Sequence, residues 1–194
     1  MSATIQAGAD WVGFVFASAS PRAITPTDAA ILAKPYSVMR VGLFVDPIDD
    51  DVAMVLAGIR LDVLQLHTTL DRARAIRQRF GIPVWHAVGV ATAADLPHAA
   101  PGIDALLLDA KAAADAALPG GNALPFDWSV LHGWHAPCPW LLAGGLTPAN
   151  VAGAITASGA TAVDVSSGVE SSRGVKSPAL IQAFVGAARS SPAA

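Results

Sequence analysis

Three polar side chains stand where short apolar runs of the sequence end. Asp109 closes the run "ALLLD", His67 closes "LQLH", and Asp164 lies within "AVDVSSG". A carboxyl group that loses water at the end of a buried strand has a raised pKa and can donate a proton as a general acid. Taken singly, each residue has a simpler interpretation, as a capping or paired carboxylate or as a buried histidine bonded to backbone. General-acid chemistry is therefore predicted only if the fold brings these three side chains close together.

Two stretches rich in small residues carry a signal for anion binding. "LLAGGLTPANV" places Gly144 and Gly145 between a predicted strand and a proline-led helix, and "VDVSSGVES" places Ser166, Ser167 and Gly168 after the last predicted strand. Glycines let an anion approach backbone N–H groups, and a helix N-terminus adds a positive dipole end. Two such stretches in succession predict a phosphate site made by these five residues.

The composition limits the partners and the compartment. The 194 residues carry a net charge of −3, and their apolar runs are interrupted after a few residues. We therefore expect no membrane span, no secretory leader and no nucleic-acid partner. The one cysteine, Cys138, cannot form an internal disulfide, which fits a reducing compartment. A cytoplasmic location is expected.

The elements that must position these residues follow from hydrophobic patterning. Seven apolar runs are predicted to be strands: residues 11–16, 39–45, 63–67, 83–88, 105–109, 140–145 and 162–168. Several are apolar nearly throughout, which is typical of parallel strands covered on both faces. Helix starts lie between them, because Thr25-Pro26 and Thr147-Pro148 each place a capping residue before a proline. Ser177 begins a last amphipathic helix.

The order of these elements predicts an α/β protein with one domain, residues 1–194. A doubly wound sheet and a (β/α)₈ TIM barrel both fit, but polar residues after many strands favour the barrel, which gathers strand ends at one mouth. Arg22, in "SASPRAI" after the first predicted strand, would then face that mouth. Cys138 directly precedes a strand and would lie on the opposite face, as a packing residue.

The seven strands are one fewer than a complete barrel has, and the first helix is short. We therefore expect a barrel that is truncated at its N-terminus and lacks its first strand. Residues 1–7 are expected to be weakly ordered, and residues 190–194 to be a frayed tail. The strands beside the gap would have free edges, which favours a homodimer. The long loop at 110–125 is predicted to be a mobile lid.

The strand-end motifs resemble, in the same order, those of the phosphoribosylanthranilate isomerase family. The resemblance runs from about Gly8 to the last helix and rests on these stretches: "GADWVGFVFASASPR", "VGLFV", "LQLH", "LLLDA", "GGNALPFDW", "LLAGGLTPANV" and "VDVSSGVESSRGVKS". It implies a (β/α)₈ enzyme of tryptophan biosynthesis that acts on a phosphosugar, N-(5-phosphoribosyl)anthranilate. The implied reaction is an Amadori rearrangement, an aldose-to-ketose isomerisation that needs no metal and no organic cofactor.

The resemblance also implies roles for the site residues. Asp109 would be the general acid that protonates the ribose ring oxygen, and Arg22 would pair with the anthranilate carboxylate. His67 and Asp164 would contact the substrate between its two charged ends. The phosphate would be held by Gly144, Gly145, Ser166, Ser167 and Gly168.

One family motif is absent from this sequence. The family's first strand carries a "KICG"-like motif whose cysteine removes the proton from the sugar C2, and no such motif occurs here. A positioned base contributes about 10²- to 10⁴-fold to a rate. Loss of activity in this form is therefore one expectation, with a true start codon further upstream as its explanation. Two other functions stay open: a non-catalytic phosphate-binding barrel, and an isomerase or epimerase of another phosphosugar.

Overall fold

The computed structural model describes residues 1–111 and 127–191, which pack as two compact units. The first unit comprises Met1–Ala87 and Pro101–Asp104, and the second comprises Val88–Ala100 and the described part of Ala105–Ala194. The predicted lid and the end of the predicted tail fall largely outside the described residues. In the part of the chain that is described, no helix has the length and apolar character needed to cross a membrane.

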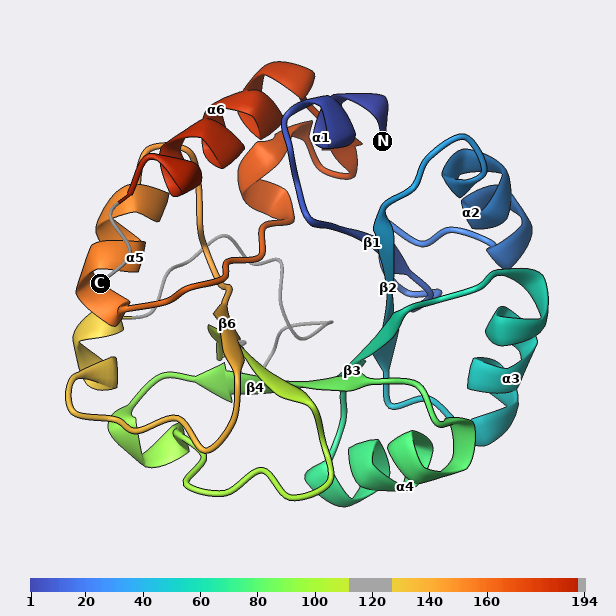
Figure 1. The fold of residues 1–194 in the computed structure, drawn as a ribbon, viewed down its shortest axis with the longest axis horizontal. Coiled ribbons are helices and arrows are strands. Elements are labelled where there is room, and N and C mark those ends of the chain that lie inside the picture. The colour runs from blue at the N-terminus through green and yellow to red at the C-terminus, as the bar shows by residue number, and fades with distance from the viewer. Residues whose placement is uncertain (112–126, 192–194) are drawn as a thin grey trace. The chain divides into compact units, whose positions relative to one another are not determined.

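Six strands form one sheet in which spatial order follows chain order (Figure 1). They are β1 (Trp11–Val15), β2 (Met39–Val45), β3 (Val63–His67), β4 (Val84–Val90), β5 (Ala105–Ala110) and β6 (Trp140–Leu142). The pairs β1–β2, β2–β3, β3–β4 and β5–β6 are parallel. All six coincide with predicted apolar runs, which confirms the parallel α/β class. Only the run at 140–145 is much shortened, because its two glycines lie beyond the end of β6.

The seventh predicted strand, residues 162–168, is wrong. Only Val163 pairs in a parallel bridge, with Leu142 of β6, and Asp164 N–H donates to the Leu142 carbonyl at 2.8 Å. The backbone then leaves the extended conformation at Ser166 and enters the 3₁₀ helix η3 (Ser167–Val169). The recorded pairing therefore stops before the run of two hydroxyl residues and a glycine, which leads into a 3₁₀ helix instead of a strand.

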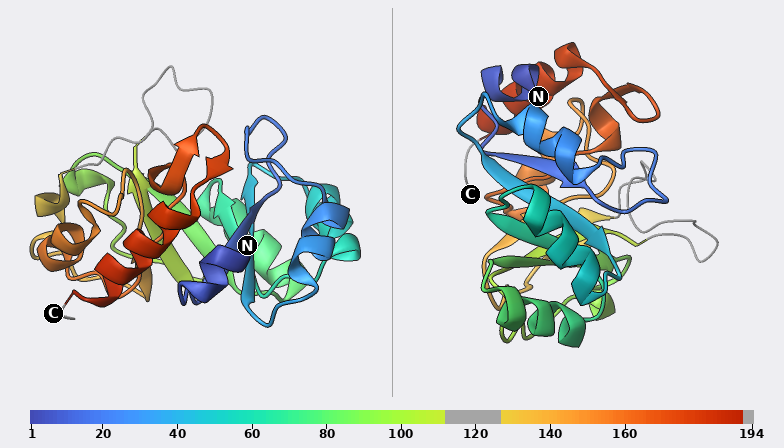
Figure 2. Two further views of the ribbon diagram at one scale, coloured as in Figure 1. Left: turned by 90° about the horizontal axis from the view of Figure 1, so that it is seen from above. Right: turned by 90° about the vertical axis from the view of Figure 1, so that its right-hand side faces the viewer.

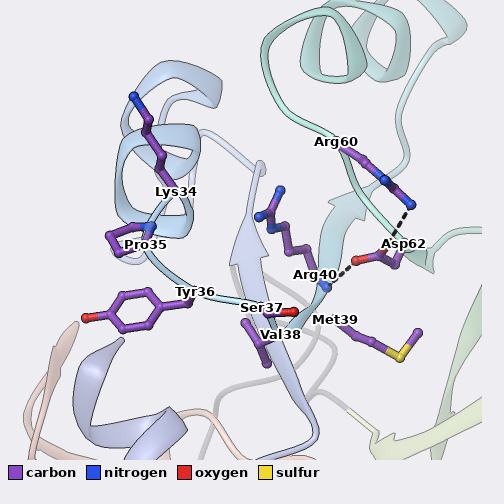
Figure 3. Close-up of a pocket in the computed structure, with 9 residues that line it drawn as sticks. All are labelled: Lys34, Pro35, Tyr36, Ser37, Val38, Met39, Arg40, Arg60 and Asp62. Atoms are coloured by element: carbon purple, nitrogen blue, oxygen red, sulfur yellow. Dashed lines mark hydrogen bonds and ion pairs between the residues drawn. The ribbon is translucent and has the colours of Figure 1, made fainter.

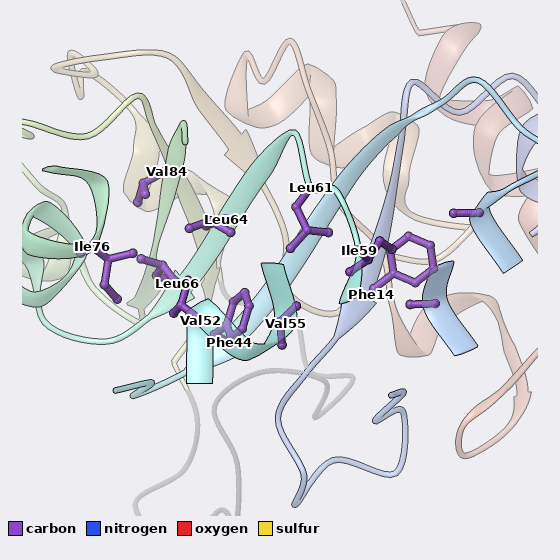
Figure 4. Packing of buried hydrophobic residues seen from close by; sticks show 13 residues of the cluster. Phe14, Phe44, Val52, Val55, Ile59, Leu61, Leu64, Leu66, Ile76 and Val84 are labelled. Carbon is purple, nitrogen blue, oxygen red and sulfur yellow. The ribbon is translucent and has the colours of Figure 1, made fainter. Parts of the chain in front are cut away.

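Helices cover one face of the strands in the first unit (Figure 1). They are α2 (Pro26–Ala33), α3 (Asp49–Gly58) and α4 (Leu70–Phe80). The predicted cap of α2 is confirmed, since the Thr25 hydroxyl accepts a hydrogen bond from Asp28 N–H at 3.1 Å. Apolar side chains of the strands and helices form one buried cluster between the two layers (Figure 4). Burial of Phe14, Phe44 and Leu64 in this cluster holds β1, β2 and β3 in place beneath their helices.

Two expectations about the start of the chain need correction. The sequence predicts weak order for residues 1–7, but Ser2–Gln6 forms helix α1, and Thr4 and Ile5 donate their N–H groups to the Met1 carbonyl. The outer edge of β1 was expected to be free, but Ile24 N–H donates to the Val15 carbonyl at 3.0 Å. The loop after β1 therefore folds back and covers the end of that edge.

The second unit carries the remaining elements: the 3₁₀ helices η1 (Ala93–Asp95) and η2 (Trp128–Leu131), then α5 (Val151–Ser158), β7 (Glu170–Ser172), β8 (Val175–Lys176) and α6 (Pro178–Arg189). β7 and β8 form an antiparallel hairpin that the apolar runs did not predict; Figure 2 shows it leading into α6 (orange to red). α5 starts later than predicted, with Asn150 rather than Thr147 as its N-cap residue. Ser177 caps α6 as predicted, by accepting a hydrogen bond from Leu180 N–H.

Candidate active site

The predicted site residues divide between the two units. Arg22 and His67 belong to the first unit, and Asp109, Asp164 and both small-residue loops belong to the second. Each residue lies at or beyond the carboxyl end of a strand or bridge, as the sequence predicts.

Asp109 is the next-to-last residue of β5, and its side chain is partly buried. Burial and, less strongly, the negative charge of Asp164 raise the pKa of the Asp109 carboxyl to about 6. One hydrogen bond opposes this shift, because Ala110 N–H donates to Asp109 Oδ1 at 2.8 Å. A carboxyl group with this pKa keeps a proton close to neutral pH, which a general acid requires.

Asp164 is another carboxyl group of the second unit, and its charge acts on Asp109. Burial raises the pKa of Asp164, while the charge of Lys176 and the N–H of Val165 act in the opposite direction. The mutual repulsion of Asp109 and Asp164 makes it costly for both to ionise. The pair can therefore hold a proton that a single exposed carboxylate would lose.

Gly144 brings the first small-residue loop against Asp109. Gly144 and Gly145 have positive φ angles of 84° and 63°, which side-chain-bearing residues rarely adopt. A Cβ atom on Gly144 would lie 2.9 Å from Asp109 Oδ1 and would overlap the backbone nitrogen of Ala110. Glycine is required here because the loop and the end of β5 approach this closely.

The second small-residue loop packs on the first. A Cβ atom on Gly168 would overlap the carbonyl oxygen of Leu146 and lie 3.2 Å from Thr147 Cα. Asn150, which the sequence reasoning missed, braces the first loop: its Oδ1 accepts from Thr147 N–H at 2.7 Å, and its Nδ2 donates to the Gly145 carbonyl at 3.0 Å. The only sequence signal for this role was its place at the start of a helix.

Backbone donors are available at the second loop. Among the described residues, no acceptor is recorded for the N–H groups of Ser167 and Gly168, the first two of η3. N–H groups in the first turn of a helix have no partner within that helix. The geometry therefore fits an anion at this loop, in the same unit as the Asp109 carboxyl.

His67, the last residue of β3, lies in a network within the first unit. Burial and the neighbouring His86 lower the pKa of His67 to about 4, against the opposing charge of Asp46. The imidazole is therefore neutral near pH 7. Its Nε2 lies 3.1 Å from Gln65 Nε2, so it accepts from the amide and leaves Nδ1–H as a donor. His86, also missed, is buried and lies with its Nε2 2.8 Å from the Thr68 carbonyl.

Arg22 lies in the loop between β1 and α2, where the sequence places it. Its side chain is partly buried, and its backbone N–H donates to Ser20 Oγ at 3.2 Å. The loop that carries it is the one that covers the edge of β1.

The first unit has a recess of about 580 Å³ (Figure 3). Its lining runs from Lys34 to Arg40 and includes Arg60 and Asp62, at the amino end of β2. The opposite end of β2 is Val45, the register partner of His67. Six residues of strand separate Met39 from Val45, or about 20 Å at about 3.3 Å per residue. This recess is therefore not the candidate site.

Cys138 lies on the face that the sequence predicts. It comes two residues before β6, and the pairing of Trp140 with Leu106 places it level with the residue before β5. Asp109 is five residues further along the neighbouring strand, which is about 16 Å at about 3.3 Å per residue. The thiol cannot take part in proton transfer with Asp109.

Comparisons with known proteins identify the family of the chain. The sequence pattern of the family described as N-(5'phosphoribosyl)anthranilate (PRA) isomerase matches residues 1–187. N-(5'-phosphoribosyl)anthranilate isomerase of Acidiphilium cryptum is 55% identical over 186 residues, which cover 96% of this chain and 91% of that protein.

Two solved structures share the fold. One shows mutually generated monomers of the dimeric isomerase from Thermotoga maritima, with a TM-score of 0.82 and 35% identity over 97% of this chain and 91% of that one. The other holds reduced 1-(o-carboxyphenylamino)-1-deoxyribulose 5-phosphate, with a TM-score of 0.81 and 33% identity over the same shares. The chain therefore belongs to the N-(5'-phosphoribosyl)anthranilate isomerase family.

Proposed function

We propose that the protein converts N-(5-phosphoribosyl)anthranilate into 1-(2-carboxyphenylamino)-1-deoxyribulose 5-phosphate, a step of tryptophan biosynthesis. One observation carries the proposal: the carboxyl group with the raised pKa, Asp109, lies against a glycine loop, which in turn packs on a loop with available N–H donors. A phosphorylated sugar that opens by protonation of its ring oxygen needs these two features together.

In the proposed reaction, Asp109 gives its proton to the ribose ring oxygen as the bond between that oxygen and C1 breaks. The product is a Schiff base between C1 and the anthranilate nitrogen. Loss of the C2 proton and tautomerisation then give the ketose amine. The phosphate is proposed to bind at Gly144, Gly145, Ser166, Ser167 and Gly168.

The remaining roles are proposed for Arg22, His67 and Asp164. The guanidinium of Arg22 would pair with the anthranilate carboxylate, since Arg offers two parallel N–H donors to a carboxylate. The neutral His67 would donate a hydrogen bond from Nδ1, and Asp164 would accept one from a sugar hydroxyl. Asp164 also keeps the proton on Asp109 through its charge.

Removal of the C2 proton needs a base beside the reacting carbons. The sequence contains one cysteine, Cys138, and it lies at the amino end of β6. That observation favours a second candidate, a barrel that binds the phosphosugar without turning it over.

A fluorescence assay tests both candidates. Purified protein is mixed with N-(5-phosphoribosyl)anthranilate, and the loss of its anthranilate fluorescence is followed; Asp109→Asn is the matched control. Turnover that the control lacks supports the isomerase. Calorimetric binding of the reduced product analogue without turnover supports the binding protein. Absence of both in folded protein contradicts both candidates.

The third possibility, action on another phosphosugar, is tested at Arg22. Arg22→Ala is expected to weaken binding of the anthranilate compound far more than binding of a plain pentose phosphate, because only the former has a carboxylate for the guanidinium. Equal loss for both ligands would favour the other phosphosugar.

Three wider expectations belong to the proposal. Closure of the sheet as a (β/α)₈ barrel is supported by the likeness to the solved isomerases. A homodimer is supported by the dimeric relative from Thermotoga maritima. A cytoplasmic location rests on the single cysteine alone.

A further inference from the structure

Lys176, in the second strand of the β7–β8 hairpin, contacts the second small-residue loop. It lies in β8, paired across the hairpin with Glu170 of β7. Its Nζ donates to the Ser166 carbonyl at 2.8 Å and lies 3.3 Å from Ser166 Oγ. The hairpin thus places the ammonium group of Lys176 beside Ser166, the first residue of the second small-residue loop.

The ammonium group of Lys176 is fixed by a buried carboxylate. Glu170 Oε1 lies 2.9 Å from Lys176 Nζ, and the Glu170 side chain is only 4% exposed. Its other oxygen, Oε2, accepts from Gly174 N–H in the hairpin turn at 3.0 Å. A buried carboxylate needs a paired cation, whereas an exposed ion pair constrains its partners little. Glu170 therefore ties the ammonium group to the hairpin beside Ser166, while the Lys176 side chain as a whole is 41% exposed.

Fixing the Ser166 carbonyl also fixes the next N–H group. In a planar trans peptide, the C=O of one residue and the N–H of the next point in opposite directions. Because the Ser166 carbonyl points to Lys176, the Ser167 N–H points away from it. That N–H has no recorded acceptor in the described part of the chain. Rotation of the same peptide would present a carbonyl oxygen where the donor now stands.

We propose that Lys176 is the positioning residue of the phosphate site, and that its ligand is the phosphomonoester end of the substrate. Held by Glu170, it keeps the peptide between Ser166 and Ser167 in the orientation that offers an N–H to the anion, and it adds a positive charge beside the loop. The inference rests on the proposed function for the identity of the substrate, but not for the binding of phosphate. It adds a side chain to a site otherwise made of backbone groups and hydroxyls.

Lys176→Met is the principal test, because methionine keeps the length of the side chain and removes the charge. The KM for N-(5-phosphoribosyl)anthranilate is expected to rise about 10-fold or more, since a charge-assisted hydrogen bond is lost. Because the charge of Lys176 also lowers the pKa of Asp164, kcat is expected to change as well, so the rise in KM is read together with phosphate affinity measured without turnover. Lys176→Arg, which keeps a donor and the charge, is expected to recover most of the loss.

Two further variants separate positioning from folding. Arg173→Met removes a cation from the exposed turn of the same hairpin, where the structure records no contact with the loop, and should leave the KM unchanged. Glu170→Gln with Lys176→Met removes both charges and leaves no unpaired buried carboxylate. This double variant should melt close to the wild type and still show the raised KM. A wild-type KM in a folded double variant would overturn the inference.

Binding of inorganic phosphate, followed by ³¹P NMR, tests the inference without turnover. The wild type and Arg173→Met are expected to bind phosphate alike, and Lys176→Met is expected to bind it about 10-fold more weakly. If the three proteins bind phosphate in this way but the wild type has no isomerase activity, the proposed function fails and the inference stands. If the isomerase is active and Lys176→Met changes neither phosphate binding nor the KM, the inference fails and the proposed function stands.

Discussion

The Asp109 carboxyl has a pKa of about 6 because it is buried near a second carboxyl group, Asp164. As the proposed general acid, it should make kcat/KM level below about pH 6 and falling at higher pH, where its proton is lost. His67, with a pKa of about 4, stays neutral between pH 5 and 8 and therefore causes no further change of kcat/KM with pH in that range. Asp109→Asn should lower kcat/KM by about 10²- to 10⁴-fold and flatten the profile. An unchanged profile in that variant would assign the acid to another residue.

The same pKa predicts how stability depends on pH. Asp109 titrates near 3.8 when unfolded and near 6 when folded, so the folded state binds more protons between these values. Its contribution is therefore favourable at low pH and is lost as the pH rises through about 6. The cost above pH 6 is at most about 3 kcal/mol at about 1.4 kcal/mol per pKa unit. Urea unfolding should find Asp109→Asn more stable than the wild type at pH 8 and equal to it at pH 3.5.

Cys138 offers a prediction of the opposite kind. Cys138→Ser changes one atom at the amino end of β6, about 16 Å along the strands from Asp109 at about 3.3 Å per residue. The kcat/KM of this variant is expected to stay within about 2-fold of the wild-type value, because a packing residue outside the site takes no part in the reaction. The fluorescence assay measures this. A loss comparable to that of Asp109→Asn would show that the thiol takes part in the reaction.

At the scale of elements, contact between the two small-residue loops holds the proposed phosphate site. Gly168→Ala puts a methyl group onto the Leu146 carbonyl, so one loop must move. We expect KM to rise at least about 10-fold and stability to fall by about 1–3 kcal/mol, as for other overpacked positions. Gly153→Ala, in α5 of the same unit with open space around it, should instead raise stability by about 0.5–1 kcal/mol. Equal effects of the two changes on KM would contradict tight loop packing.

At the scale of the whole molecule, the remaining question is association. Among the described residues, pairing on the outer edge of β1 is recorded only at its end, where Ile24 N–H donates to the Val15 carbonyl, and strands with open edges tend to pair. We predict a homodimer, with a sedimentation mass of twice the chain's 19.7 kDa. A mass of one chain at all protein concentrations would show that the covering loop protects the edge.

Local chemistry in the sequence determined most of the elements. Apolar runs placed six strands because a buried parallel strand needs apolar side chains on both faces. Thr25 and Ser177 marked helix starts because a hydroxyl caps N–H groups only two or three residues away. The same patterning put Asp109 and His67 at strand ends, so the candidate acid follows from the order of residues along the chain.

Only the tertiary structure decided the properties that depend on residues distant in the chain. The raised pKa of Asp109 comes from its burial and, less strongly, from the charge of Asp164, and the contact of Ser166 with Lys176 comes from the hairpin that carries this lysine. A residue's type is present in the sequence, but its burial and its charged neighbours exist only once the chain has folded. The sequence by itself therefore specified the family and the candidate acid, and the fold specified how that acid and the two small-residue loops are held.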